Sequence, residues 1–167
     1  MISVIVPTLN DEHRLASALA PLVPAAMEGL VRELIICDGG STDATFEIAD
    51  DAGARFLKLE GEESARIAEG AKMAKGPWLL VLDPCVRLDF GWEQAALKHM
   101  NARKAPGRFR LQKSDGGFWD ALFPPKARAV LILIGGSAGG RGVGHGVDGR
   151  RYDGVGQAHL LDARGWV

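Results

Sequence analysis

Short apolar segments alternate with helical segments through the first half of the chain, and this alternation limits the fold more than any other feature. The segments typical of buried strands are rich in Val, Ile and Leu and cover residues 2–10, 31–40, 54–59 and 78–83. The segments between them carry apolar residues at helical spacing and cover residues 11–22, 41–53 and 62–75. Strands joined by helical crossovers run parallel. The sequence therefore predicts an α/β fold, with a doubly wound, mostly parallel sheet and flanking helices.

Prolines, glycines and a serine predict where these helices begin and end. Pro21 and Pro24 are expected to end the first helix, because proline interrupts helical hydrogen bonding. Ser41 is the predicted N-cap of the second helix. Gly76 and Pro77 are expected to close the third.

The pattern weakens after Trp92. Residues 91–104 predict a helix, and residues 108–112 and 129–134 predict strands. Half of the 22 glycines lie between residues 135 and 165, in a stretch with neither a helical nor a strand period. We therefore expect an α/β domain over residues 1–134, followed by an irregular, Gly-rich C-terminal tail over residues 135–167.

Composition excludes two classes of function. The 20 Lys and Arg residues against 21 Asp and Glu give a net charge of −1, so the chain lacks the positive excess that holds nucleic acid. No apolar run reaches the length of a transmembrane segment, and the N-terminus lacks the pattern of a secretory signal. The two cysteines, Cys37 and Cys85, fit a reducing compartment, so we expect a cytoplasmic protein.

Polar residues follow three of the predicted strands. Asn10, Asp38 and Asp83 each lie at a carboxyl end. In parallel sheets, ligands bind beyond these ends, so the three residues predict a ligand site at one edge of the sheet.

Three segments together resemble the family 2 glycosyltransferases, which have the GT-A fold. These segments are SVIVPTLNDE, ELIICDGGSTDAT and GAKMAKGPWLLVLD, at residues 3–12, 33–45 and 70–83. The resemblance covers about residues 1–100, and the C-terminal part is atypical and shortened. It implies a GT-A-like domain that binds a nucleotide-diphosphate sugar and transfers the sugar, with inversion, to an acceptor hydroxyl.

The resemblance also implies which residues bind the nucleotide. Asp38 would accept a hydrogen bond from uracil, while Pro7, Thr8 and Asp11 would line the base and ribose pocket. Asp38 has a structural alternative, because aspartate is common in a turn before glycine. Asp83 would contact the ribose or a metal ion.

The metal motif departs from the family pattern. The family ends its fourth strand with a D-x-D-type motif, whose last aspartate holds Mg²⁺ or Mn²⁺ on the diphosphate. The residues here are Asp83, Pro84 and Cys85. These ions prefer oxygen ligands, so Asp83 is the remaining candidate ligand, and Cys85 predicts weakened metal binding and reduced activity.

Two further features bear on catalysis. Where relatives often carry a basic residue, this chain has Glu62 and Glu63, with Arg66 one turn later. The inverting mechanism needs a carboxylate base, yet no Glu follows Glu93. The aspartates that remain in the second half are Asp115, Asp120, Asp148, Asp153 and Asp162.

Two alternatives to an active transferase remain open. One is a catalytically weak or inactive nucleotide-sugar binding protein of the same fold, which Cys85 and the missing base favour. The other is a structural role, in which the apolar strand near Ile132 and the glycine tail mediate self-association.

Overall fold

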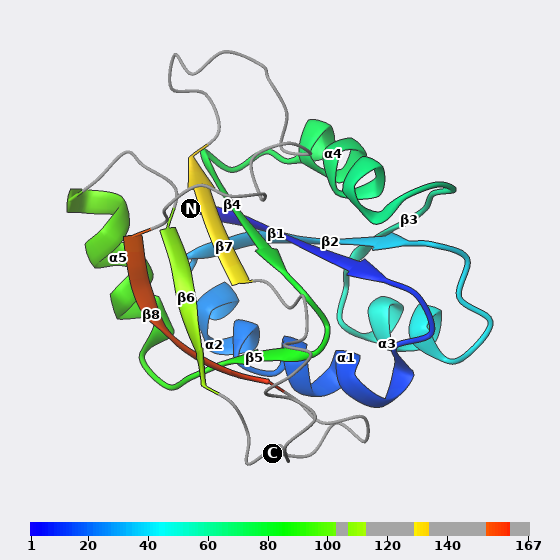
Figure 1. The fold of residues 1–167 in the computed structure, drawn as a ribbon, viewed down its shortest axis with the longest axis horizontal. Helices are drawn as coiled ribbons and strands as arrows, with labels where there is room; N and C mark the ends of the chain where they lie inside the picture. The colour runs from blue at the N-terminus through cyan, green and yellow to red at the C-terminus, as the bar shows by residue number, and fades with distance from the viewer. Residues whose placement is uncertain (103–106, 113–128, 134–152, 161–167) are drawn as a thin grey trace, which may run out of the picture.

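A computed structural model describes residues 1–102, 107–112, 129–133 and 153–160 of the chain (Figure 1). The described strands are β1 (Ile2–Thr8), β2 (Val31–Asp38), β3 (Arg55–Lys58), β4 (Trp78–Leu82), β5 (Val86–Leu88), β6 (Gly107–Gln112), β7 (Ala129–Leu133) and β8 (Asp153–Leu160). The described helices are α1 (Glu12–Leu19), α2 (Leu22–Met27), α3 (Thr45–Asp51), α4 (Glu63–Met73) and α5 (Trp92–Ala102). None of these helices is long and apolar enough to cross a membrane.

The described strands form one sheet in the order β3-β2-β1-β4-β7-β6-β8-β5. The first four are parallel neighbours, which confirms the predicted α/β fold with a mostly parallel sheet in this half. Beyond them, β7 pairs antiparallel with both β4 and β6. The strand β8 runs parallel to β6 and antiparallel to β5.

Strand β1 lies at the centre of the parallel half and is buried along its whole length. Its side chains alternate between two cores. Val4 and Val6 pack with the core under α1 and α2, whereas Ile5 packs with Ile67 of α4 in the second core. Figure 1 shows α4 on one face of the sheet and α1, α2 and α3 on the other. Each fully buried aliphatic side chain contributes about 1.5–3 kcal/mol, so both faces stabilise the sheet.

The first helix is shorter than expected, and a second helix follows it. The structure ends α1 at Leu19 and begins α2 at Leu22, so Pro24 lies in the first turn of α2 instead of ending α1. Proline is tolerated in a first turn, because the N–H that it lacks has no intrahelical acceptor there. The prediction that both prolines end α1 is therefore wrong for Pro24.

The predicted N-cap of the next helix is also wrong. Helix α3 begins at Thr45, with Ala44 at the cap position. The Ser41 hydroxyl instead donates a hydrogen bond to the Asp38 carboxylate. The side chain that accepts from the backbone N–H of Thr45 is Asp43, at 3.1 Å.

Two strands were not expected from the sequence. The three residues of β5 follow the β4 turn too closely to show a period. Strand β8 lies inside the tail that was predicted to be irregular, so that prediction is wrong for residues 153–160. Residues 134–152 and 161–167 lie outside the described part of the chain, and the boundary near residue 135 stays a prediction.

Helix α4 packs on the sheet through a glycine. A Cβ atom added to Gly70 would overlap with Sγ of Cys37 on β2, and it would lie 3.3 Å from Cδ1 of Ile5. The helix backbone therefore approaches the sheet more closely than any other residue type would permit. This approach fixes the position of the α4 residues that face the strand ends.

We expect Gly70→Ala to destabilise the fold by about 1–3 kcal/mol, because the added methyl group overpacks the contact with Cys37. In a Cys37→Ala background, the sulfur is absent and the same change should be neutral or stabilising, since alanine favours helix over glycine. Urea unfolding of the two single variants and the double variant measures this coupling. An equal cost of Gly70→Ala in both backgrounds would contradict the packing argument.

Candidate functional site

A pocket of about 440 Å³ opens where β1 and β4 end. Of the residues predicted from the sequence, Pro7, Thr8, Asp11 and Asp83 line it. Asp38 lies behind Thr8 and is not among the lining residues. The other lining residues come from the loop after β1, from α1, from the segment that leads into α4 and its first turns, and from the turn after β4. They are Leu9, Arg14, Gly61, Glu62, Glu63, Arg66, Pro84 and Cys85.

The Asp38 carboxylate is buried and accepts hydrogen bonds on both oxygens. Oδ1 accepts from the Thr8 hydroxyl at 3.0 Å and from the Ser41 hydroxyl. Oδ2 accepts from the backbone N–H groups of Gly40 and Ser41, each at 2.8 Å. Burial by itself would raise the pKa of Asp38, but these hydrogen bonds outweigh it and lower that pKa below its ordinary value. The side chain is therefore an ionised link between the end of β1 and the loop after β2.

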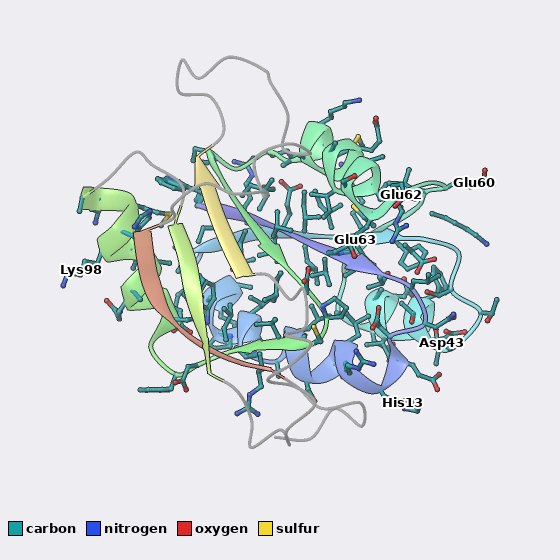
Figure 2. All side chains as sticks on the ribbon, in the orientation of Figure 1. His13, Asp43, Glu60, Glu62, Glu63 and Lys98 are labelled. Atoms are coloured by element: carbon teal, nitrogen blue, oxygen red, sulfur yellow. The ribbon has the colours of Figure 1, made fainter. Side chains whose placement is uncertain are left out.

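The loops after β1 and β2, with the helix residues that follow them, form one hydrogen-bonded unit, which we call the paired loops (residues 9–12 and 39–45). The backbone N–H of Glu12 donates to Asp43 Oδ2 at 3.0 Å, and that of Ala44 donates to Glu12 Oε2 at 2.9 Å. The acidic side chain of each segment thus satisfies a backbone N–H at the start of the other segment's helix. Figure 2 labels Asp43 on this unit.

Asn10 links the two segments of the paired loops through its backbone N–H and its side chain. Its φ angle of 56° lies in the left-handed region, which asparagine tolerates better than most residues. Its backbone N–H donates to the Ser41 hydroxyl at 2.8 Å, and its Oδ1 accepts from the Thr42 N–H at 2.9 Å. The sequence placed Asn10 at the site, and the structure gives it a contact inside the paired loops.

Asp11 follows Asn10 and lines the pocket. Its Oδ2 accepts from the Leu9 N–H at 2.9 Å, and its own N–H donates to the Thr45 hydroxyl at 3.0 Å. Burial is the largest cause that raises the pKa of Asp11, and it outweighs the hydrogen bond from Leu9 and the attraction of Arg14. The carboxylate therefore lies in a partly desolvated position beside a cation.

The turn after β4 does not fit a divalent cation held at the position of Cys85. Burial raises the pKa of the Cys85 thiol to about 11, and the negative charge of Asp83 adds to this rise. The thiol is therefore neutral near pH 7, and a neutral thiol is a poor ligand for Mg²⁺ or Mn²⁺. Within the described residues, no group of three His, Cys, Asp or Glu side chains is arranged to hold a metal ion.

Arg66 brings a buried positive charge to the pocket. Its side chain is 8% exposed, and Nη1 donates to the carbonyl oxygen of Gly61 at 2.7 Å. The guanidinium also lies against Gly39, where an added Cβ would be 2.9 Å from Cζ. Its Nε is buried and has no hydrogen-bond acceptor among the described residues. The Nε–H group of Arg66 is thus available to a ligand, at a site where the family resemblance implies a diphosphate.

Arg14 is the site residue that the sequence analysis missed. It lies on α1, half-buried, and lines the same pocket as Cys85. The sequence indicates Arg14 only weakly, because the helical spacing of residues 11–22 predicts only which side chains form the apolar face. Its spacing of three residues from Asp11 puts both on one side of the helix start, and this could have pointed to it.

Comparison with known proteins gives the chain a family. Residues 3–129 match the sequence model of a family described as glycosyl transferase family 2. A PGL/p-HBAD biosynthesis glycosyltransferase of Mycobacterium tuberculosis (strain H37Rv) is 33% identical over 95 residues, which cover 49% of this chain and 34% of that protein. Glucosyl-3-phosphoglycerate synthase of the same strain is 44% identical over 59 residues, which cover 35% of this chain and 18% of the synthase.

A solved structure extends the likeness to three dimensions. The crystal structure of the M. tuberculosis glucosyl-3-phosphoglycerate synthase in complex with Mn²⁺, UDP-glucose and phosphoglyceric acid superposes with a TM-score of 0.61. Its sequence identity is 21%, over 80% of this chain and 56% of that one, so the likeness shows a shared fold. This chain spans about a third of the first relative and about half of the solved one. Because the family model covers most of the 167 residues, the chain belongs to glycosyl transferase family 2.

Proposed function

We propose that the pocket binds a nucleotide-diphosphate sugar, with UDP as the nucleotide, and that the protein transfers the sugar with inversion to an acceptor hydroxyl. The observation that carries this proposal is the position of the pocket at the carboxyl ends of β1 and β4, with Arg66 buried in its wall. Ligands of parallel sheets bind at such ends, and a buried guanidinium is a strong partner for a phosphate. The UDP-glucose held by the solved relative supports the choice of ligand.

The predicted site residues divide into two roles in this proposal. Pro7, Thr8, Asp11 and Asp83 contact the nucleoside, because they line the pocket. Asp38 is a positioning residue, because its four hydrogen bonds occupy both oxygens and hold Thr8 in place. This differs from the direct uracil contact that the family resemblance implied. We propose a cytoplasmic location for the protein, since both cysteines are free.

Binding without efficient transfer is the second candidate function, and Cys85 is the observation that favours it. A neutral thiol cannot stabilise a departing diphosphate as a bound cation does. The carboxylate base is not assigned: Asp115, Asp120, Asp148 and Asp162 lie outside the described residues, and Asp153 opens β8 without a described side chain. A transfer assay therefore has to distinguish the two candidates.

We expect calorimetry of the wild-type protein to detect UDP and UDP-glucose with dissociation constants of about 1 μM to 1 mM. Glu62→Gln should strengthen binding of both by up to roughly fivefold, because it removes a negative charge from the pocket wall. Glu60→Gln is the matched control, since Glu60 is an exposed carboxylate two residues away that does not line the pocket (Figure 2). Release of UDP from UDP-glucose with an acceptor would support transfer, whereas binding without release would support the second candidate. A wild-type protein that binds neither ligand would refute both.

We expect Asp38→Ala to destabilise the fold by about 3 kcal/mol or more, because four donors lose their acceptor and two of them are backbone N–H groups. Asp50→Ala removes an exposed carboxylate of α3 and should change stability by less than about 0.5 kcal/mol. Thermal and urea unfolding measure both effects. A stable Asp38→Ala variant that has lost only UDP affinity would instead support direct contact with uracil.

We expect Cys85→Asp to make UDP binding depend on Mn²⁺, because the new carboxylate would supply a second oxygen ligand near Asp83. Titrations of wild type and variant, each with Mn²⁺ and with chelator, give the metal dependence. Cys85→Ser is the control, since it removes the thiol without adding a charge. Equal metal dependence in all three proteins would contradict this account of position 85.

A further inference from the structure

The guanidinium of Arg14 is a second cation in the pocket and has no role in the function proposed above. Arg14 lies in the first turn of α1, half-buried, and shares the pocket with Cys85. Among the described residues, its guanidinium has neither an ion pair nor a hydrogen bond. Asp11 attracts this charge but forms no ion pair with it, so the guanidinium of Arg14 is available to a ligand.

Arg14 and Arg66 reach the pocket from opposite sides. Arg14 belongs to α1 and Arg66 to α4, and these helices cover opposite faces of the sheet (Figure 1). Arg66 lies beside Gly39 at the end of β2, while the charge of Arg14 acts on Cys85 in the turn after β4. The two arginines therefore line one pocket from helices on opposite faces of the sheet.

The lining contains more negative than positive charge. Asp11, Glu62, Glu63 and Asp83 supply four carboxylates, against the two guanidinium groups. A diphosphate adds further negative charge, so it needs a cation close by. Cys85 stands where the family motif places a metal-binding carboxylate, and sulfur is a poor ligand for Mg²⁺ and Mn²⁺.

Resting on the proposed function, we infer that Arg14 and Arg66 together bind the diphosphate of the nucleotide, so that binding needs no divalent metal ion. A guanidinium is always charged and donates two parallel hydrogen bonds to phosphate oxygens, which suits it to this task. Arg66 has a buried Nε with no acceptor among the described residues, and Arg14 lines the same pocket without a described ion pair. Arg14 thus offsets the negative charge of the diphosphate. In the family resemblance, a metal ion at the position of Cys85 has this role.

The test is calorimetry of wild type and Arg14→Gln with three ligands: UDP, uridine and inorganic pyrophosphate. Each titration is made once with a chelator and once with Mn²⁺. Arg32→Gln is the matched control, because Arg32 is an exposed arginine at the start of β2, at the opposite end of the strands from the pocket. Urea unfolding of all three proteins confirms that they are folded alike.

We expect wild type to bind UDP with the same affinity, to within about threefold, in chelator and in Mn²⁺. Arg14→Gln should weaken UDP binding by about tenfold or more and leave uridine binding unchanged, because only the diphosphate contact is lost. Arg32→Gln should change neither affinity.

Two results would overturn the inference while the proposed function stands, and a third applies where the proposed function fails. Loss of UDP binding by wild type in chelator would assign the diphosphate to a metal ion, while the nucleotide site itself would stand. Equal UDP-to-uridine affinity ratios in Arg14→Gln and Arg32→Gln would remove Arg14 from the site. If wild type binds neither UDP nor uridine, the proposed function fails, and pyrophosphate decides the inference: binding in chelator that Arg14→Gln weakens supports it, and absence of binding refutes it.

Discussion

The buried carboxylate of Asp38 holds together the two loops on which the shape of the pocket depends. It joins the last residue of β1, Thr8, to backbone N–H groups of the loop after β2. Those donors lie in a partly buried loop, where a lost acceptor costs stability, so the carboxylate and the loop stabilise each other. Because the paired loops also fix the start of α1, the positions of Asp11 and Arg14 follow from the same interaction.

The two faces of the sheet bring different chemistry to this edge. The face under α1 contributes the loop after β1 and Arg14, while the face under α4 contributes the buried guanidinium of Arg66. Both helices are anchored by strands whose side chains alternate between two cores. A parallel sheet covered on both faces can thus direct opposing side chains at one ligand, without a long loop to carry them.

Much of this arrangement could be predicted from the sequence, because it depends on local patterns. Apolar runs that alternate with helical segments predict the parallel strands. Polar residues at the strand ends indicate the edge of the sheet where the pocket lies. Of the three strand-end residues, Asp83 lines the pocket, whereas Asn10 and Asp38 are not among the lining residues. Pro7, Thr8 and Asp11, which the family resemblance implied, also line it. Their roles toward a ligand remain predictions.

The remaining features depend on contacts that no local pattern encodes. Pro24 was interpreted as a helix end, although its place in a first turn is set by how α2 packs. Strand β8 is rich in small residues and forms through pairing with β5 and β6. Arg14 lies close to Cys85 only because the chain folds, so spacing along the sequence does not connect them. Asp38 accepts hydrogen bonds on both oxygens, and one of these bonds likewise comes from another strand, from Thr8.

The contact between Gly70 and Cys37 constrains how this chain can change over evolutionary time. With a sulfur atom at position 37, position 70 has no room for any side chain. A substitution at position 70 therefore costs less stability after the residue at position 37 has become smaller. A lineage that exchanges both residues thus loses least stability when the residue on β2 becomes smaller first.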